Sequence, residues 1–401
     1  MLTGILIGIL VSFAALPLLI LVLEFLIRLT RSRQSKLAHD HLRRSGRLTF
    51  LDAYDDPEEG LNSPPWEDAE TEYNTYLGFA PKASFATSAY QINRYHFRYV
   101  EDFPVEKAPG EIRIFVTGGS KAWGAGVTQE KLYTRLLEER FQKIPAYSRL
   151  RVICAAGGAY CTTQERIMIE NVILRLSPDY VVMFSGRNDC YFGYIGKDIM
   201  LDQDYFKYRR LIHPKEPSSL ELSRYDDYSF KLHFLFDRIV YHARKARQGK
   251  GPATDVPKDA RRSSIDPAKV IETFFANVHI VSDISRRYGF KLIFYLEPSI
   301  FSSAKPMSAW EQSILARTGD NLRGFPEYNS EIYDKLREML GRDAHENSYL
   351  FLDGDAAISD TTESVFSDNV HFGDRGYELI ATHMLAELRE IMNKATLPRN
   401  V

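Results

Sequence analysis

The segment PDYVVMFSGRND, at positions 178–189, contains the clearest strand signal in the chain. Its five apolar residues, Tyr180–Phe184, are bounded by Pro178-Asp179 on one side and Ser185-Gly186 on the other. A short apolar run between turn residues is typical of a strand that is buried on both faces. Such strands occur in parallel sheets whose two faces are covered by helices. The segment therefore predicts an α/β fold.

Further strands and helices are expected on both sides of this run, from apolar segments with strand or helix spacing. The other expected strands are Ile112–Val116, Val152–Cys154, Lys291–Leu296 and Tyr349–Leu352. The expected helices are Glu130–Gln142, Gln164–Leu176, Val270–Arg287, Glu331–Leu340 and Gly376–Met392. Strands that alternate with helices predict a three-layer α/β/α sandwich on a parallel sheet of roughly five strands.

Composition excludes some classes of function. The chain has 401 residues and a formal net charge of −2, so no overall field attracts it to nucleic acid. Its three cysteines, Cys154, Cys161 and Cys190, are an odd number, and we expect buried thiols in place of a disulfide framework. The histidines lack the spacing of a metal site, and no metal or organic cofactor is expected.

Residues 1–30 are expected to form a membrane anchor. Leu2–Leu23 contains no charged residue, and a helix needs about 20 apolar residues to cross a bilayer. A cleaved signal peptide is the alternative, but the segment lacks a basic region before the apolar run and a small-residue cleavage site after it. Arg28 and Arg31 follow the span, and the positive-inside rule then places the rest of the chain in the cytoplasm.

The remaining sequence divides by composition. Residues 31–72 are polar and charged and are expected to form a juxtamembrane linker. Residues 73–110 are rich in aromatic side chains and are expected to pack on the main domain, residues 111–395, as an extension. An insertion at about 191–266 interrupts that domain and is long for a connection. It is either a lid or substrate wall beside a site, or a surface elaboration.

Chemically reactive residues fall where the expected strands end. The first three strands are followed by Gly118-Gly119-Ser120, Gly157-Gly158 and Gly186-Arg187-Asn188, in that order. The last strand is followed by Asp368 and His371. Because open parallel sheets bind ligands at the carboxyl ends of their strands, these residues should meet at one edge. A serine, a histidine, an aspartate and turns that carry N–H donors are the groups needed for acyl transfer.

The same segments, in the same order, resemble the four sequence blocks of the SGNH (GDSL-like) hydrolases. The blocks are Gly118-Gly119-Ser120, Gly157-Gly158, Gly186-x-Asn188-Asp189 and Asp368-x-x-His371. Each block is short enough to occur by chance, but four in order, each at an expected strand end, are specific. The resemblance covers roughly residues 73–386. It implies the SGNH hydrolase fold, with a flavodoxin-like sheet.

The resemblance also implies a role for each residue. Ser120 would attack an ester carbonyl, His371 would take and return the proton, and Asp368 would hold the imidazole. The oxyanion hole would comprise the backbone N–H of Ser120, a backbone N–H in Gly157-Gly158 and the side chain of Asn188. Serine, asparagine and aspartate also cap helices and turns, which is the structural alternative for these positions.

Two blocks depart from the family pattern. The first reads Gly-Gly-Ser-Lys where the name-giving motif reads Gly-Asp-Ser-Leu, so Lys121 follows the serine. The Lys121 side chain could attract an anionic substrate or point to solvent, and we expect it to point to solvent. The second has Gly157-Gly158 where many relatives have an asparagine and a single glycine, so which glycine donates to the oxyanion stays open.

The expected function is that of a serine esterase whose substrate is an O-acetylated glycan or a lipid ester. Two alternatives remain: an O-acyltransferase that uses the same residues on surface glycans, and a catalytically silent subunit or scaffold of a membrane complex. Anchored members of the family usually work outside the cytoplasm. We therefore expect an extracytoplasmic catalytic domain, against the positive-inside indication.

Overall fold

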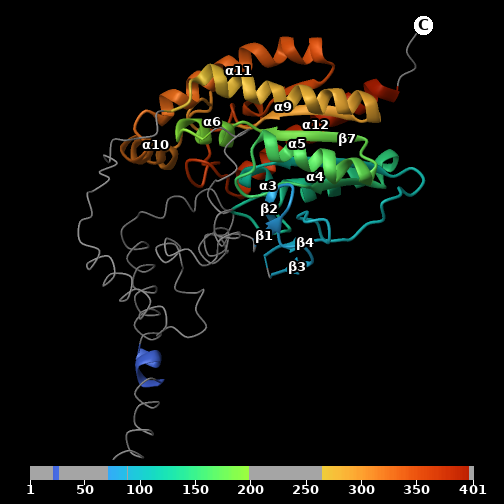
Figure 1. Cartoon of the computed structure of the whole chain (residues 1–401), viewed down its shortest axis with the longest axis horizontal. Helices are drawn as coiled ribbons and strands as arrows, with labels where there is room; N and C mark the ends of the chain where they lie inside the picture. The colour runs from blue at the N-terminus through green and yellow to red at the C-terminus, as the bar shows by residue number, and fades with distance from the viewer. Residues whose placement is uncertain (1–20, 27–70, 88, 198–263, 397–401) are drawn as a thin grey trace, which may run out of the picture. The chain divides into compact units, whose positions relative to one another are not determined.

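The computed structural model describes residues 21–26, 71–87, 89–197 and 264–396 (Figure 1). The chain divides into two units, one of residues 1–48 and 212–260 and the other of residues 49–211 and 261–401. In the first unit only residues 21–26 are described, and they are helical. Among the described residues, no helix has both the length and the apolar character needed to span a bilayer.

Several expected segments lie wholly or mainly outside the described residues. They are most of the anchor at 1–30, nearly all of the linker at 31–72, and positions 198–263 of the insertion. The end of the expected linker and the start of the expected insertion are described. The last two linker residues belong to β1 (Thr71–Asn74), and the first insertion residues belong to α6 (Arg187–Tyr194).

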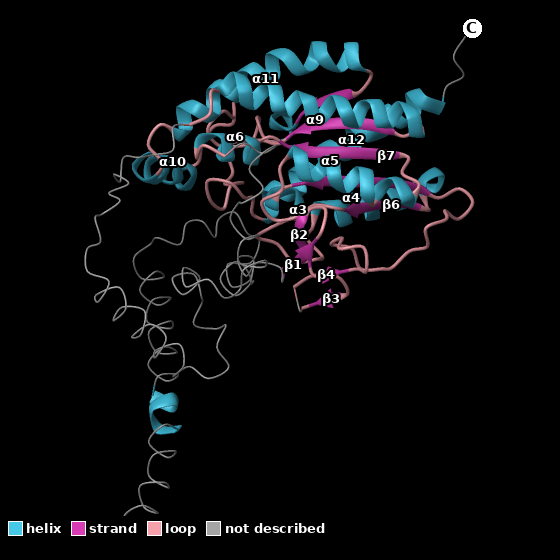
Figure 2. Ribbon diagram, viewed as in Figure 1, coloured by secondary structure: helices cyan, strands magenta, loops and turns pink. Residues whose placement is uncertain are grey.

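A five-stranded sheet forms the centre of the second unit (Figure 2). Its spatial order is β6 (Leu150–Cys154), β5 (Ile112–Gly118), β7 (Tyr180–Ser185), β8 (Lys291–Leu296) and β9 (Leu350–Asp353). All neighbouring strands are parallel. Numbered along the chain, the order is 2-1-3-4-5, which is that of flavodoxin-like sheets. The prediction of a parallel α/β sheet is confirmed.

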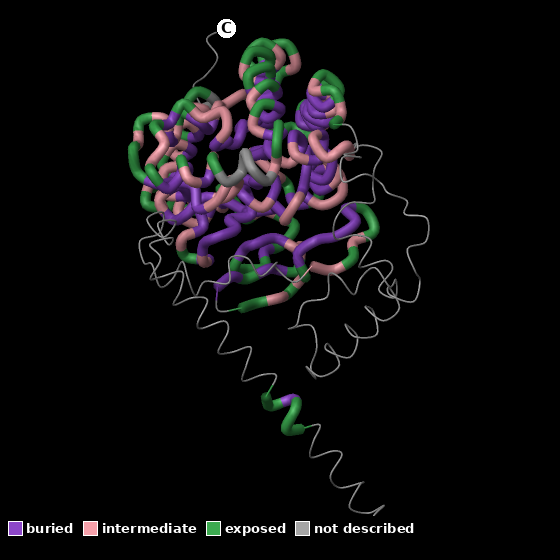
Figure 3. The backbone as a smooth tube through the Cα atoms, turned by 90° about the vertical axis from the view of Figure 1, so that its left-hand side faces the viewer, coloured by how far each residue is buried: buried purple, intermediate pink, exposed green. Residues whose placement is uncertain are grey.

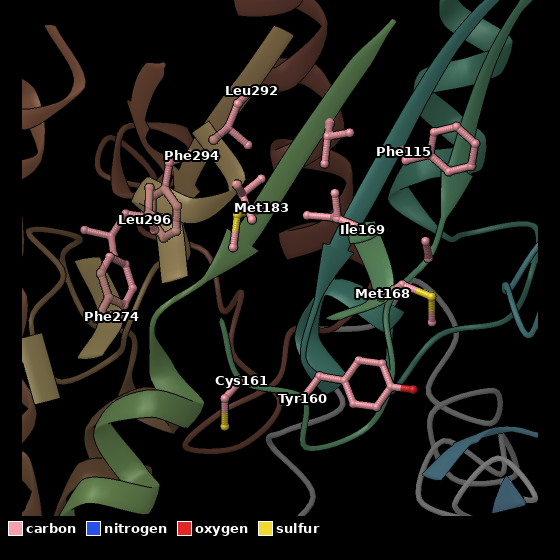
Figure 4. Close-up of a cluster of buried hydrophobic side chains, with 14 of the residues drawn as sticks. Phe115, Tyr160, Cys161, Met168, Ile169, Met183, Phe274, Leu292, Phe294 and Leu296 are labelled. Carbon is pink, nitrogen blue, oxygen red and sulfur yellow. The ribbon is translucent and has the colours of Figure 1, made fainter. Parts of the chain in front are cut away.

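Helices cover both faces because alternate side chains of the strands point in opposite directions. On one face Phe115, Met183 and Phe294 belong to a buried cluster (Figure 4). The helices that complete this cluster are α5 (Thr162–Asn171), α9 (Pro267–Tyr288) and α11 (Phe325–Asn347).

On the other face Val116, Phe184 and Tyr295 belong to a second buried cluster. The helices that complete it are α4 (Tyr133–Gln142), α10 (Ala309–Asn321) and α12 (Asp374–Thr396). Figure 3 shows the resulting separation of buried backbone inside from exposed backbone outside.

One expected helix is interrupted in the structure, and helices α6 and α10 were not predicted. The expected helix Gln164–Leu176 is interrupted at Val172, whose φ of −122° lies outside the helical range, and continues as a 3-10 turn, Ile173–Leu176. Helix α10 was missed altogether. Its sequence places few apolar residues at helical spacing, and its contact with the sheet depends mainly on Trp310 and Ile314.

The aromatic extension packs on the sheet. Its hairpins are β1 with β2 (Gly78–Pro81) and β3 (Phe85–Ala86) with β4 (Gln91–Ile92). Phe97 and Phe103 are buried, with ring centroids 5.9 and 6.3 Å from that of Phe115. The N–H of Arg98 donates to the carbonyl of Cys154 on the edge strand β6, at 3.0 Å.

Candidate active site

The site lies at the carboxyl ends of the strands. β5 leads directly into the one-turn helix α3 (Ser120–Trp123), and β7 leads into α6. Figure 1 labels α3, β7 and α6. The segment 368–371 precedes α12. Because β5 pairs with both β6 and β7, the turns that follow these three strands share one edge of the sheet.

Ser120, His371 and Asp368 form a continuous hydrogen-bonded chain. Ser120 Oγ is 2.8 Å from His371 Nε2, across 251 positions of sequence. His371 Nδ1 is 2.9 Å from Asp368 Oδ2. Asp368 Oδ1 accepts the backbone N–H groups of Val370 and His371, both at 2.6 Å. These backbone bonds curl the loop so that two side chains three residues apart can face each other.

The surroundings of Asp368 favour its ionised form. Burial acts in the opposite direction, since it disfavours a charged carboxylate. The electrostatic interaction with His371 and the hydrogen bonds from His371 and Val370 outweigh it, and they lower the pKa of Asp368 below its ordinary value. Asp368 is therefore a carboxylate at neutral pH, and the pairing orients the imidazole with Nε2 towards Ser120.

Two glycines allow the turn after β5 to approach its neighbours. Gly118 has φ +144°, and a Cβ built there would lie 2.2 Å from the carbonyl oxygen of Phe184. A Cβ on Gly119 would lie 2.2 Å from Asn188 Nδ2. Only glycine therefore permits Asn188 to sit beside the residue that precedes Ser120. Asn188 Nδ2 also donates to the carbonyl of Tyr160, at 2.8 Å, which fixes the amide in place.

The structure separates the two glycines of the second block. The N–H of Gly157 donates to the carbonyl of Gly118, at 3.1 Å, and is therefore occupied. A Cβ on Gly157 would lie 2.6 Å from the ring of Tyr160. A Cβ on Gly158 would meet nothing within 4 Å, so Gly158 borders open space.

The expectation that Lys121 points to solvent was wrong. Its side chain is 2% exposed, and Nζ donates to the carbonyl of Pro298. Nζ lies 3.5 Å from Glu297 Oε2 and 5.0 Å from the ring centroid of Phe372. Burial lowers the pKa of Lys121, and the charge of Glu297 opposes that effect. The short helix α3 directs this side chain beneath the edge of the sheet and away from the surface.

Glu297 was not singled out from the sequence. It follows β8 directly, and its Oε1 accepts the backbone N–H of Arg187 at 2.5 Å. Its two oxygens thus join the residue after Ser120 to the residue before Asn188. The available signal was its position, since Glu297 is a polar residue directly after a buried strand. The same kind of position marked Ser120 and Asn188.

Asp189 and Glu165 are buried acids that support the turns. Asp189 accepts a hydrogen bond from Thr162 Oγ1 at 2.6 Å, and burial raises the pKa of Asp189 to about 7. Glu165 accepts one from Thr117 Oγ1 at 2.7 Å, and burial raises the pKa of Glu165 to about 8. Both bonds attach the start of α5 to the elements that carry the site, and neither acid contacts Ser120.

The other polar candidates have structural surroundings. Cys154, Cys161 and Cys190 are free thiols and are buried. His383 Nδ1 is 3.0 Å from the hydroxyl of Tyr295, on the covered face of the sheet. Among the described residues, no cluster of three or more His, Cys, Asp or Glu side chains is placed to bind a metal ion.

Comparisons with known proteins give similar structures but no sequence family. No model of a protein family matches the chain, and no curated protein matches it significantly. An acetyl xylan esterase has 16% identity and a TM-score of 0.38, over 69% of this chain and 100% of its own. A lipolytic protein of the G-D-S-L family from Desulfitobacterium hafniense has 12% identity and a TM-score of 0.37, over 69% and 99%.

A third similar structure is an acetylxylan esterase from Geobacillus stearothermophilus. It has 14% identity and a TM-score of 0.36, over 69% of this chain and 94% of its own. All three similarities are low in identity and in TM-score. The function proposed below therefore rests on the residues of this chain.

Replacing Glu165 by glutamine is expected to reduce the dependence of stability on pH. The pKa of Glu165 is about 8 in the folded protein, against an ordinary value of 4.5. Between these values the folded state holds a proton that the unfolded state has lost, so stability falls as pH rises. The thermal unfolding midpoint of the wild type should fall more than that of Glu165→Gln between about pH 5 and about pH 9.

Asp189 is present in both proteins, and its charge is one of the causes that raise the pKa of Glu165. Identical changes in midpoint for the wild type and Glu165→Gln would show that Glu165 is ionised in the folded protein.

Proposed function

We propose that this chain is a serine esterase of the SGNH type, with Ser120 as nucleophile, His371 as general base and Asp368 as the residue that orients it. The observation that carries the proposal is the hydrogen-bonded chain from Ser120 Oγ through His371 to Asp368, with contacts of 2.8 and 2.9 Å. If Asp368 served only as a structural cap, its hydrogen bond to the His371 side chain would not be required, because Asp368 already caps the loop through its other oxygen.

The proposed reaction proceeds in two acyl transfers. Ser120 Oγ attacks the ester carbonyl carbon while its proton moves to His371 Nε2. The tetrahedral intermediate then expels the alcohol, which takes the proton from His371, and the acyl group remains on Ser120. A water molecule, deprotonated by His371, attacks this acyl-enzyme and releases the acid. Asp368 stabilises the imidazolium in both halves without accepting its proton.

Three donors are available for the oxyanion in this proposal. They are the backbone N–H of Ser120, the backbone N–H of Gly158 and the side-chain amide of Asn188. Gly157 is unsuited because its N–H is bound to Gly118. One N–H of the Asn188 amide binds Tyr160, which leaves the other for the oxyanion. Loss of one such donor typically lowers kcat by about 10²- to 10³-fold.

The nature of the acyl acceptor separates the esterase from the alternative acyltransferase. Both would form the same acyl-enzyme on Ser120, and they would differ in whether water or a sugar hydroxyl attacks it. The buried polar supports behind the turns and the pairing of His371 with Ser120 favour an enzyme over a silent subunit. We take hydrolysis of an ester as the proposed activity, with O-acetylated glycans and lipid esters as the candidate substrates.

Hydrolysis of 4-nitrophenyl acetate and 4-nitrophenyl hexanoate by the full chain in detergent tests this activity. The wild type should release 4-nitrophenol, because both esters need only a nucleophilic serine and an oxyanion hole. Ser120→Ala should lower kcat by at least about 10³-fold, since it removes the attacking atom.

A matched control is Ser313→Ala, because Ser313 Oγ donates to a carbonyl of its own helix, α10. It should retain wild-type turnover. Equal turnover by wild type and Ser120→Ala would contradict the assignment of the nucleophile. Turnover that appears only when a sugar acceptor is added would favour the acyltransferase.

We also propose that Leu2–Leu23 anchors the protein in a membrane, with the catalytic domain on the extracytoplasmic side. The support is the uncharged run in the sequence. Full-length protein should stay in the membrane fraction after alkaline carbonate extraction, and a variant that lacks residues 1–30 should not.

External protease should cleave the catalytic domain in intact spheroplasts. Release of the full-length protein by carbonate would refute the anchor, and protection from protease would reverse the orientation.

A further inference from the structure

Arg187 differs from the other fully buried arginines of the described domain. Its side chain is 3% exposed, and Nε is buried without a hydrogen-bond partner. Among the described residues, no oxygen accepts a hydrogen bond from its guanidinium, and the contact with Glu297 uses the backbone N–H. Arg187 thus holds its charge in the interior without a side-chain hydrogen bond to any described residue.

Arg98 and Arg113 show how this chain normally treats a buried guanidinium. Both are 0% exposed. Arg98 donates to three backbone carbonyls, those of Trp123, Gly124 and Val127, and to the side chain of Gln129. The groups that accept hydrogen bonds from Arg113 are Glu111 and the carbonyls of Pro104, Val105, Glu106 and Leu176. The chain therefore satisfies buried arginines that have only a structural role.

Aromatic rings surround the guanidinium of Arg187 without satisfying it. Its central carbon lies 4.2 Å from the ring centroid of Phe325, 5.4 Å from that of Tyr191 and 5.8 Å from that of Phe301. Ring faces stabilise a cation only modestly. They do not replace the in-plane acceptors that its N–H groups require, and an arginine stays charged even when buried. An anion would satisfy the N–H groups of Arg187.

The charges around Arg187 do not supply a hydrogen-bond acceptor for its side chain. Glu297 Oε1 accepts only the backbone N–H of Arg187, and Glu297 Oε2 lies 3.5 Å from Lys121 Nζ. Burial lowers the pKa of Arg187, and nearby Tyr333, Cys190 and Glu297 oppose that effect. An anion in contact with the guanidinium would supply the acceptor that Glu297 does not.

A cavity beside Arg187 has room for such a group. It has a volume of about 460 Å³ and is lined by Arg187, Lys197 and Asn188 together with apolar side chains that include Ile195, Leu322 and Val370. This volume lies in the usual range for small-molecule sites. The cavity reaches the proposed catalytic groups through Asn188, which lies against Gly119, and Val370, whose N–H binds Asp368.

We propose that this cavity binds an anionic group of the ester substrate, a carboxylate or a phosphate, with Arg187 as its ligand. The inference rests on the proposed esterase function and specifies the substrate class: an ester with an apolar body and an acidic group. The planar fork of a guanidinium suits both anions, because each presents two oxygens to it. The apolar lining of the cavity accommodates the apolar part of the substrate. The ester carbonyl would lie at the end of the cavity formed by Asn188.

Binding to the full-length Ser120→Ala protein tests the site without requiring turnover. Hexanoate, hexyl phosphate and 1-hexanol share a six-carbon chain and differ in the end group, and calorimetric titration gives a Kd for each. We expect at least one of the two anions to bind about ten- to a hundredfold more tightly than hexanol, the range for a charged hydrogen-bonded contact. Whichever anion binds more tightly identifies the acidic group.

The same titrations are repeated with Arg187→Met in the Ser120→Ala background. The Kd of the preferred anion should then lie within about threefold of that of hexanol, and so below the tenfold preference expected with Arg187 present. Arg187→Lys, which keeps the charge, should retain a preference for the anion. Arg149→Met is the matched control. Arg149 is exposed, donates to the Pro109 carbonyl and precedes β6, at the amino ends of the strands and so opposite the proposed site. It should leave all three Kd values unchanged.

Two results would overturn the inference: binding of hexanol as tightly as both anions, or a preference for anions that survives in Arg187→Met. The absence of binding by either anion would overturn it as well. These outcomes are separate from the fate of the esterase proposal. Ser120-dependent ester hydrolysis without anion preference would refute only the anion site, and anion binding without any Ser120-dependent turnover would refute only the esterase.

Discussion

The parallel pairing of β5 with both β6 and β7 is the constraint on which the site depends. Parallel strands end at the same edge, so the turns after these three strands are adjacent although 30 or more residues separate them. Gly118 and Gly119 then permit contacts that any side chain would block. Asn188 therefore lies against Gly119, the residue before Ser120, and the loop at 368–371 supplies His371 from the far end of the chain.

Behind this edge, buried charges hold the turns in position. Glu297 accepts the N–H of Arg187 and faces the ammonium group of Lys121, so one carboxylate joins the segments on both sides of the proposed oxyanion hole. Removal of one partner from such a buried set usually destabilises a protein strongly, because a charge is left uncompensated. The same set leaves Arg187 short of an acceptor, and this connects the support of the site to its proposed selectivity for an acidic substrate.

Much of the fold could be predicted because the strands are short apolar runs between turn residues. Tyr180–Ser185 and Lys291–Leu296 are examples, and their buried character requires a covered parallel sheet. The blocks at Ser120, Asn188 and His371 could also be located, since each follows a strand. Their hydrogen bonds depend on long-range packing that spacing alone does not give.

The direction of Lys121 could not be predicted in the same way. A lysine after a surface turn normally points to solvent, and its burial depends on Glu297 and Pro298, which are distant in sequence. Helix α10 was missed because its apolar spacing is weak, and the break at Val172 was missed because the apolar pattern of the helix continues through it. Reaction of the full-length protein with a fluorophosphonate, followed by mapping of the adduct by mass spectrometry, tests the central claim. The account predicts modification of Ser120 that disappears in His371→Ala. An unmodified Ser120 in the wild type, or equal modification in His371→Ala, would contradict it.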